Sequence, residues 1–185
     1  MIYLETPLTV DKIKQLHAGD EVYLSGTIYT GRDAAHKRLI QFLDEGKELP
    51  FDIQDQTIFY VGPTPSKPGQ VFGSGGPTTS GRMDAYSPRL IGLGLHAMIG
   101  KGYRNEAVKK AIVDHCGVYF GAIGGAGAMM SSCIEECEII AFDDLGPEAI
   151  RKLKVKNMPL VVVIDHLGND LYEIGRKNYL KNDCQ

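Results

Sequence analysis

The sequence contains no tryptophan, and only four of its 185 residues are cysteines. So few cysteines in a chain of this length do not form the pattern of a disulfide-stabilised secreted domain. The formal net charge of −3 gives no general reason to expect nucleic acid or an anionic membrane as a partner. Apolar runs are shorter than the roughly 18–20 residues that a membrane-spanning helix needs. The first residues lack the basic and then apolar layout of a signal peptide, so a cytoplasmic location is expected.

Apolar residues and glycine, in contrast, are plentiful. Hydrophobic residues make up 43% of the chain and charged residues 23%, which suits one globular domain with its own core. The 22 glycines and 9 prolines indicate many tight turns of the backbone. We therefore expect a single domain over residues 1–185, with a loosely held polar tail at 176–185.

Hydrophobic patterns predict short strands that alternate with short helices, which is typical of a layered α/β domain. The expected strands cover residues 1–4, 21–29, 57–61, 93–99, 118–120, 138–141, 160–164 and 171–174. The expected helices cover residues 10–16, 33 to about 46, and 105–115, and a further helix is expected to open at 145–148. The Ser-Pro pair at 87–88 is expected to break the helical turn before it.

Three glycine-rich turns each carry one cationic side chain. In the stretch SGTIYTGRDAAHKR, a strand runs through a glycine into a helix that opens beside Arg32. The stretches GPTTSGR and IGKG place Arg82 and Lys101 in similar turns. The start of a helix presents unpaired N–H groups and the positive end of the helix dipole, so an anion suits such a position. Together the three turns predict a common pocket for a small ligand with several negative charges.

Four further side chains in or beside these turns are candidates for proton transfer. Thr78 lies four residues before Arg82, where a hydroxyl either caps a helical turn or takes part in chemistry. Asp33 is either an acidic residue in the first turn of its helix or a site residue. His36, one turn further, is either a surface residue or faces the site. Asp84 is the fourth candidate, and spacing alone leaves these alternatives open.

Other motifs fail their context tests. The segment GAIGGAG resembles a weak dinucleotide loop, but no suitable acidic residue follows about 20 residues later. Cys133 and Cys137 are four residues apart, yet no second cysteine pair completes a metal site, so they are expected to be structural. Neither a Ser-His-Asp nor a Cys-His arrangement stands out. This chain is therefore predicted to hold no metal ligand.

The blocks SGTIYTGRDAAHKR, GPTTSGRMD, IGKG, GAIGGAGA and AFDDLGPEAIRKLKVKNMP occur in this order along the chain. In sequence and order they resemble the β subunit of iron–sulfur (class I) fumarate hydratases, which is the C-terminal domain of the one-chain members. The L(+)-tartrate dehydratase β subunit is a close relative in the same hydro-lyase family. The resemblance covers nearly the whole chain and implies a swivelling β/β/α-type layered domain with short strands and helices.

The resemblance also implies roles for individual residues. Three cationic positions match those that bind the carboxylates of the substrate: Arg32, Arg82 and Lys101. Thr78 matches the proposed acid/base threonine of the family, which works opposite an aspartate of the α subunit. Asp33 and His36 belong to the same motif as Arg32 and are expected only to support Arg32 and the pocket.

The implied α subunit carries a [4Fe–4S] cluster on three cysteines, with one iron open to bind substrate, so the cluster is expected on the partner and not on this chain. The implied reaction is the reversible addition of water to fumarate, which gives (S)-malate. The open iron would act as a Lewis acid, and the cationic residues would hold the dicarboxylate in register. A threonine is a weak acid in water, so Thr78 would need a dry pocket and positive charge nearby.

Two alternatives to a fumarate hydratase subunit remain. The first is an L(+)-tartrate dehydratase β subunit, and the second is a non-catalytic module that binds a carboxylate or a phosphate. In either enzyme this chain is expected to be active only with its α subunit. The expected assembly is a heterotetramer or a homodimer of this chain.

Overall fold

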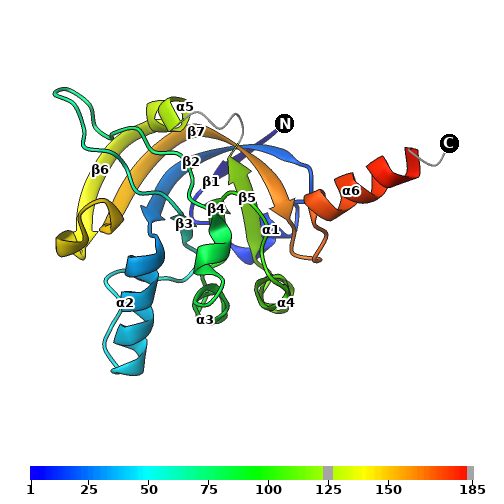
Figure 1. Ribbon diagram of the computed structural model, residues 1–185, viewed down its shortest axis with the longest axis horizontal. Helices are drawn as coiled ribbons and strands as arrows, with labels where there is room; N and C mark the ends of the chain where they lie inside the picture. Colours follow the sequence, from blue (N-terminus) through cyan, green and yellow to red (C-terminus); the bar gives the residue numbers. More distant parts are fainter. Residues whose placement is uncertain (123–126, 183–185) are drawn as a thin grey trace.

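The computed structural model describes residues 1–122 and 127–182, and it contains a seven-stranded sheet with several short helices (Figure 1). The strand order is β1-β2-β3-β4-β5-β7-β6, and β2 also pairs with β7. The pairings of β2 with β3, β3 with β4, β4 with β5, β5 with β7 and β7 with β2 form a closed circuit, so the sheet curves back on itself. The mixed α/β class expected from the sequence is confirmed.

Five consecutive strands pair in parallel, and two pair in antiparallel fashion. The parallel strands are β1 (Ile2–Glu5), β2 (Glu21–Thr30), β3 (Thr57–Phe59), β4 (Ala97–Gly100) and β5 (Val118–Ala122). The antiparallel strands are β6 (Ile134–Ala141) and β7 (Ile150–Ile164). With 15 residues, β7 is long enough to pair with β6, β2 and β5 along its length, and it therefore closes the sheet.

The sheet is apolar on both faces because neighbouring residues of its central strands enter two different clusters. Ile99 and Phe120 pack into the first cluster, whereas Met98 and Tyr119 pack into the second. Side chains alternate between the two faces of a strand, so a strand buried on both faces has a continuous apolar sequence. This is why the expected strands at 57–61 and 118–120 could be recognised as short apolar runs.

Helical residues pack on both faces of this sheet, since Ile13 and Met130 lie in helices and belong to the first apolar cluster. The helical segments are α1 (Val10–Ile13), α2 (Asp33–Asp44), the 3₁₀ turn η1 (Ser80–Met83), α3 (Ser87–Gly92), α4 (Glu106–Asp114), α5 (Gly127–Ser132), the 3₁₀ turn η2 (Asp143–Glu148) and α6 (Leu171–Asn182). Leu39 of α2, Leu90 of α3 and Ile112 of α4 belong to the second apolar cluster, and these helices lie together on one side of the sheet (Figure 1). No helix in the described ranges is both long and apolar enough to cross a membrane.

The strand expected at 21–29 and the helix expected from 33 onward are both confirmed. The first is β2 and the second is α2, and the chain passes from one to the other at Gly31. The expected strands at 1–4 and 138–141 correspond to β1, which lies at the edge of the sheet, and to the end of β6. The expected helix at 105–115 is α4, and the Asn105 side chain caps it by accepting the N–H of Val108.

The Ser-Pro pair at 87–88 begins a helix instead of breaking one, so this prediction is wrong. Pro88 lies in the first turn of α3, where a helix needs no backbone N–H donor. Because α3 extends to Gly92, the strand expected at 93–99 is shortened to β4. Gly94 has φ +104° and turns the chain between the helix and the strand.

The residues at 145–148 do not open a helix either. They belong to η2, which ends at Glu148, and a single residue separates it from the start of β7 at Ile150. Gly146 has φ +58° and ψ −117°, which interrupts helical geometry. The Arg151 side chain of β7 donates to the carbonyl oxygens of this turn and holds it against the strand.

The strand expected at 171–174 is the beginning of α6. The preceding turn is present, because the Asp165 carboxylate accepts backbone N–H groups within it. Asp170 then accepts the N–H of Tyr172 at 2.9 Å, which caps a first helical turn and directs the chain into a helix.

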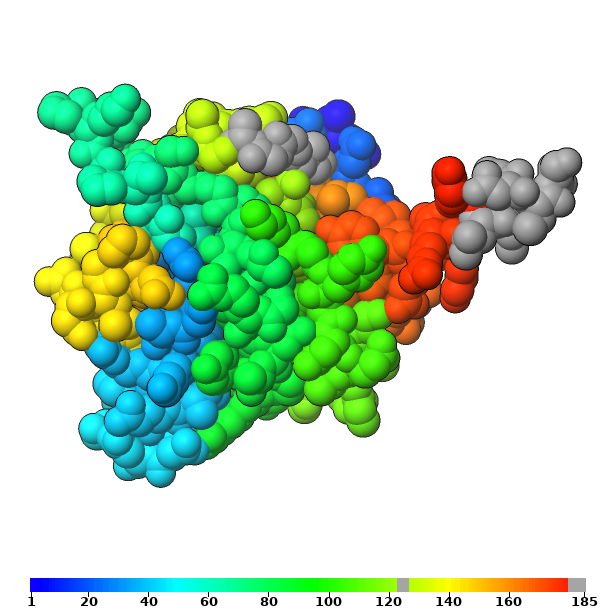
Figure 2. Space-filling model, viewed as in Figure 1, coloured from blue at the N-terminus to red at the C-terminus, as the bar shows by residue number. Residues whose placement is uncertain are grey.

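The segment expected to be a loose tail continues α6 as far as Asn182, and residues 176–179 are exposed. The helix projects away from the sheet (Figures 1 and 2). Residues 183–185, and residues 123–126 of the glycine-rich segment, lie outside the described residues.

Candidate active site

The glycine-rich turns that carry the candidate cations meet at one edge of the sheet. β2, β3 and β4 are parallel neighbours, and Thr30, Phe59 and Ile99 lie in register across them. The carboxyl ends of parallel strands lie at the same edge of a sheet, which is where ligands bind in many α/β domains. Arg32 follows β2 by two residues, and Lys101 follows β4 directly. The structure therefore brings these two cations to the same edge.

The segment that contains Thr78 is held at this edge by hydrogen bonds to the strand ends. The N–H of Thr78 donates to the carbonyl oxygen of Tyr60 at 2.7 Å, just beyond β3. The N–H of Ser80 donates to the carbonyl oxygen of Lys101 at 2.9 Å, and the N–H of Lys101 donates to Ser80 Oγ at 3.0 Å. Thr78 and the beginning of η1 therefore lie between the ends of β3 and β4, close to Lys101.

Gly100 makes this close approach possible. A Cβ atom at this position would lie 1.9 Å from Ser80 Oγ and 2.8 Å from the Tyr60 ring. Gly102, on the other side of Lys101, has φ +84°, which favours glycine. The two glycines of the IGKG block therefore allow the close packing and the turn of the backbone. Together they fix the position of Lys101 between them.

Arg32 and Arg82 lie on either side of one carboxylate, that of Asp33. Arg82 forms an ion pair with Asp33 Oδ2, and Arg32 Nε lies 4.0 Å from Asp33 Oδ1. The Arg82 side chain is 55% exposed and the Arg32 side chain 24%. Lys101 is also exposed and has no ion-pair partner within the part of the chain that the structure describes. The edge thus presents three cations that Asp33 only partly neutralises, and such a surface suits a carboxylate or a phosphate.

A second acid, Glu148 of η2, lies near Arg32. Its Oε1 atom is 3.8 Å from Arg32 Nε and accepts the N–H of Ala34 at 3.3 Å. One of the N–H groups at the start of α2, which the sequence predicted to be open to an anion, is therefore bonded to a carboxylate of the protein. The local sequence around Glu148 gives no sign of this contact, because 114 positions separate it from Ala34.

His36 is fully buried, so the alternative of a surface residue is wrong. Its Nδ1 atom lies 2.8 Å from the carbonyl oxygen of Arg32, which requires Nδ1 to carry the proton and donate it. Its ring packs edge-on against Tyr60, with 5.4 Å between the ring centroids. Burial lowers the pKa of His36 to about 4. The charge of Arg104 also lowers this pKa, whereas the hydrogen bond to the backbone of Arg32 raises it. His36 is therefore neutral at pH 7 and holds the backbone of Arg32.

We expect the free energy of unfolding to fall as the pH is lowered from about 6.5 to about 4. In this range the unfolded chain binds a proton at His36 and the folded chain does not, because the folded pKa is the lower one. The free energy of unfolding is therefore greatest above the pKa that His36 has in the unfolded chain. Below that pKa, this residue alone lowers the free energy of unfolding by about 1.4 kcal/mol per pH unit. Urea unfolding curves across this range measure the slope.

The matched variants are His36→Gln, which should flatten this slope, and His17→Gln, which should not. His17 is the control because its side chain is 63% exposed. If His36→Gln and the unaltered chain lose stability equally between pH 6.5 and 4, the buried neutral histidine is not responsible.

Arg104, which the sequence analysis did not single out, lies beneath the site. Its side chain is 0% exposed, and its Nε donates to Asp84 Oδ1 at 2.7 Å. A terminal nitrogen donates to Ser87 Oγ at 2.9 Å and to Tyr60 Oη at 3.3 Å. The guanidinium also lies over the rings of Tyr60 and Tyr119, 5.3 and 4.9 Å from their centroids. Asp84, a candidate for proton transfer in the sequence, is thus the ionic partner of a buried arginine.

Tyr119 connects this buried arginine to two of the turns above it. Its hydroxyl lies 2.8 Å from Ser80 Oγ and donates to the carbonyl oxygen of Gly102 at 3.0 Å. Burial raises the pKa of Tyr119, so the hydroxyl keeps its proton and remains a donor. The turns that carry Thr78 and Lys101 are therefore fixed to each other from below by hydrogen bonds.

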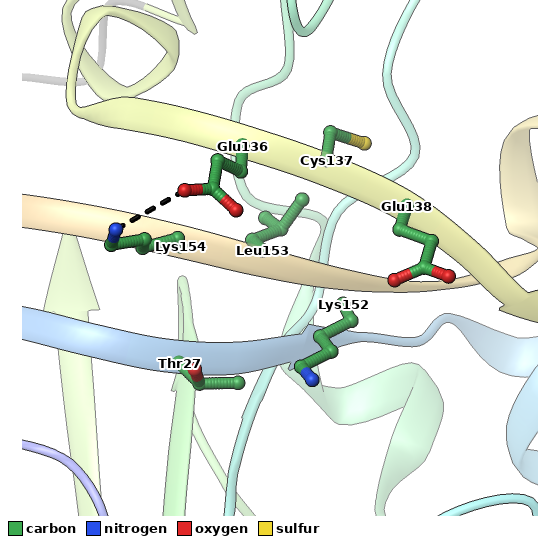
Figure 3. A pocket seen from close by; sticks show the side chains of 7 residues that line it. All are labelled: Thr27, Glu136, Cys137, Glu138, Lys152, Leu153 and Lys154. Atoms are coloured by element: carbon green, nitrogen blue, oxygen red, sulfur yellow. Dashed lines mark hydrogen bonds and ion pairs between the residues drawn. The ribbon is translucent and has the colours of Figure 1, made fainter.

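A separate groove of about 270 Å³ lies over β2, β6 and β7 (Figure 3). It is lined by Thr27, Glu136, Cys137, Glu138, Lys152, Leu153 and Lys154. Its lining includes none of the candidate site residues, and Glu136 and Lys154 form an ion pair at 3.1 Å there. Burial raises the pKa of the Cys137 thiol, which makes it a poor nucleophile at neutral pH.

Metal ligands do not gather in the described ranges. No group of three or more histidine, cysteine, aspartate or glutamate side chains in residues 1–122 and 127–182 could hold a metal ion. Cys116, Cys133 and Cys137 are free thiols, and Cys184 lies outside the described residues. The donor set that the structure describes therefore does not fit an iron–sulfur cluster.

Comparison with known proteins adds evidence from outside the chain. A putative L(+)-tartrate dehydratase subunit beta of Methanocaldococcus jannaschii is 39% identical over 188 residues, covering 98% of this chain and 96% of that protein. The anaerobic class I fumarate hydratase of Escherichia coli strain K12 is 40% identical over 164 residues, covering 88% of this chain and 30% of that enzyme. A putative class I fumarate hydratase of Geobacillus stearothermophilus is 37% identical over 190 residues, covering 100% of this chain and 36% of that protein.

This chain thus spans about a third or less of the length of several fumarate hydratases, but nearly the whole of one tartrate dehydratase subunit. A family model described as Fumarase C-terminus matches residues 1–175, which include all the candidate site residues. The chain belongs to the Fumarase C-terminus family.

Proposed function

We propose that this chain is the β subunit of an iron–sulfur hydro-lyase that reversibly hydrates fumarate to (S)-malate. The observation that carries the proposal is the meeting of Arg32, Arg82 and Lys101 beside Thr78, at the carboxyl ends of β2, β3 and β4. Fumarate and malate carry two carboxylates, so they need cations at two points of the site. Arginine offers each carboxylate a bidentate fork, and lysine adds a point charge.

Thr78 would transfer one proton in this reaction. Its backbone is fixed to the end of β3, and the exposed Lys101 follows the adjacent strand end. The cationic side chains around it would stabilise the negative charge that develops on the hydroxyl oxygen when it loses its proton. Binding the dicarboxylate in a fixed orientation would add several kcal/mol to the rate enhancement.

The other half of the site would belong to an α subunit. Arg82 and Lys101 are exposed, as expected for side chains that a second protein covers during the reaction. A [4Fe–4S] cluster on that subunit would supply a Lewis acid to the substrate. The residues of this chain would bind and orient the dicarboxylate and move one proton at Thr78 Oγ1.

L(+)-tartrate is the second candidate substrate, and one comparison favours it specifically. The M. jannaschii protein described as a tartrate dehydratase β subunit has nearly the same length as this chain, whereas the fumarate hydratases above are about three times longer. Tartrate also carries two carboxylates, so the same three cations would serve it. A non-catalytic module that binds a carboxylate or a phosphate is the alternative without enzyme activity.

Three finer features belong to the proposal, and the family resemblance implies the first of them. They are the swivelling β/β/α layering of the domain, the cytoplasmic location, and the assembly as a heterotetramer or a homodimer of this chain. An α subunit as partner is supported by the description of the M. jannaschii relative as a subunit.

The decisive experiment is anaerobic co-purification with the α subunit, followed by assays on fumarate and on L-tartrate side by side. Malate formation that requires both chains would support the proposal, and oxaloacetate formation from tartrate would favour the second substrate. The chain alone is the control and should give no product and, after iron–sulfur reconstitution, no absorbance near roughly 400 nm. An assembled complex that is inactive on both substrates would leave only the non-catalytic module.

We expect Arg32→Ala and Arg82→Ala each to lower kcat/KM of the assembled enzyme by roughly 10- to 150-fold. The reason is the loss of one charge-assisted contact to a substrate carboxylate, worth about 1.5–3 kcal/mol. Arg89→Ala is the matched control, because Arg89 is an arginine of comparable exposure to Arg82 that pairs with Asp44 on the surface. An Arg82→Ala enzyme that unfolds more easily but keeps normal kinetics would mark the residue as structural.

A further inference from the structure

The η2 turn, which ends at Glu148, is anchored to the chain from two sides. Arg38 of α2 forms a bidentate pair with Asp144, with distances of 2.7 and 2.9 Å. Arg151 of β7 donates to the carbonyl oxygens of Gly146 and Pro147, each at 3.1 Å. In Figure 2 the surface of this turn, in yellow-orange, lies directly beside the blue surface of α2. These contacts give the turn a fixed position against α2.

The Arg32 side chain is confined between this turn and the segment after β3. A Cβ atom at Gly62 would lie 2.9 Å from a terminal nitrogen of Arg32 and 3.1 Å from the carbonyl oxygen of Pro147. The glycine thus leaves the space through which the arginine passes. Arg32 Nε is buried without a hydrogen-bond partner, and it lies 3.8 Å from Glu148 Oε1 and 4.0 Å from Asp33 Oδ1.

We propose that Glu148 is a positioning residue that directs Arg32 toward the substrate carboxylate. This inference rests on the proposed function, in which Arg32 binds a carboxylate. Glu148 acts at the Nε side of the guanidinium, which leaves the terminal nitrogens for a substrate. The Glu148 carboxylate accepts the N–H of Ala34, which fixes it at the start of α2. Its negative charge therefore keeps a constant position relative to α2 and to the Arg32 guanidinium.

The kinetic test is a double-mutant cycle in the assembled two-subunit enzyme. Glu148→Ala should raise KM about tenfold and change kcat little, because substrate binding loses a prepositioned arginine. In an Arg32→Ala background the same change should have no further effect on KM. Glu148→Gln, which keeps an acceptor for Ala34 but removes the charge, covers the case in which the alanine variant folds poorly. Equal effects of Glu148→Ala with and without Arg32 would overturn the proposal.

The matched control is Glu136→Ala, which breaks a glutamate–lysine pair in the groove of Figure 3, outside the candidate site. This variant should leave KM unchanged. If it raises KM as much as Glu148→Ala does, the effect is not specific to the arginine that Glu148 faces.

A second readout uses this chain alone and does not depend on activity. The Nε resonance of Arg32, assigned by its absence in Arg32→Lys, should shift in Glu148→Gln and stay in place in Glu136→Gln. If the enzyme is inactive on both substrates but this shift occurs, the proposed function is wrong and the contact between Glu148 and Arg32 is still supported. In that case Glu148 has no role in directing Arg32 toward a substrate. An unshifted resonance in Glu148→Gln would overturn the proposal in either case.

Discussion

Replacing Thr78 with alanine should lower the turnover of the assembled two-subunit enzyme by roughly 10²–10⁴-fold, which is the usual effect of losing a general acid or base. KM should change little, because Arg32, Arg82 and Lys101 remain to bind the carboxylates. The capping alternative has less support in the structure than in the sequence, since the residue that precedes η1 is Thr79. Thr78 contributes its backbone N–H to Tyr60, and alanine keeps that bond. The free energy of unfolding of the variant should therefore lie within about 1 kcal/mol of that of the unaltered chain.

Thr78→Ser and Thr79→Ala separate the chemical role from a structural one. Serine keeps the hydroxyl and should retain most of the turnover, whereas Thr79→Ala should leave the rate almost intact. Steady-state kinetics and urea unfolding curves of all three variants are the measurements. A destabilised Thr78→Ala enzyme with normal turnover would remove Thr78 from the reaction and leave this chain as a carboxylate clamp.

The parts of the fold that the sequence predicted depend on local patterns. β3 and β5 are short apolar runs buried on both faces, and Gly31 and Arg32 link the end of β2 to the start of α2. The closure of the sheet could not be predicted in this way, because its cause is the length of β7. That strand contains Asn157 with φ +49° and Pro159, which are both typical of a strand's end.

The interruption in β7 is tolerated because of a partner in another strand. Ser25 Oγ of β2 accepts the N–H of Asn157 at 2.9 Å, and the register between the two strands shifts at this point. A β-bulge absorbs the irregular residue while the ladder continues on both sides. The contact joins positions 132 residues apart, so nothing in the local sequence of β7 reveals it.

The same distinction applies to the candidate site. Arg32, Arg82 and Lys101 could be found because each lies in a glycine-rich turn beside a strand or a helix. Arg104 and Glu148 could not, because what defines them is a set of partners elsewhere in the chain. Tyr60 is 44 positions from Arg104, and the glutamate acts on a helix that begins more than 100 positions earlier.

The second large effect is expected in stability. Asp84→Ala should lower the free energy of unfolding by about 3–5 kcal/mol, because it leaves the charge of Arg104 buried without its partner. Burial disfavours that charge, but Tyr60 and Asp84 outweigh burial and raise the pKa of Arg104. An arginine guanidinium does not lose its proton in proteins, so Arg104 cannot escape the cost in this way once Asp84 is removed. The N–H of Asn105 also loses its acceptor, Asp84 Oδ2, at 2.7 Å.

Urea unfolding of Asp84→Ala beside Asp44→Ala makes this a direct test. Asp44 pairs with Arg89 on the surface, so removing it should have almost no effect on the unfolding midpoint. The double variant Asp84→Leu/Arg104→Met should regain much of the lost stability, since it removes both charges and leaves apolar side chains of similar size. Equal midpoints for Asp84→Ala and Asp44→Ala would mean that water or another group reaches Arg104. If the double variant is stable but has a raised KM, the Asp84–Arg104 pair contributes to substrate binding separately from its contribution to stability. Arg104 would then be dispensable for folding, yet needed to fix the turns that carry Thr78 and Lys101.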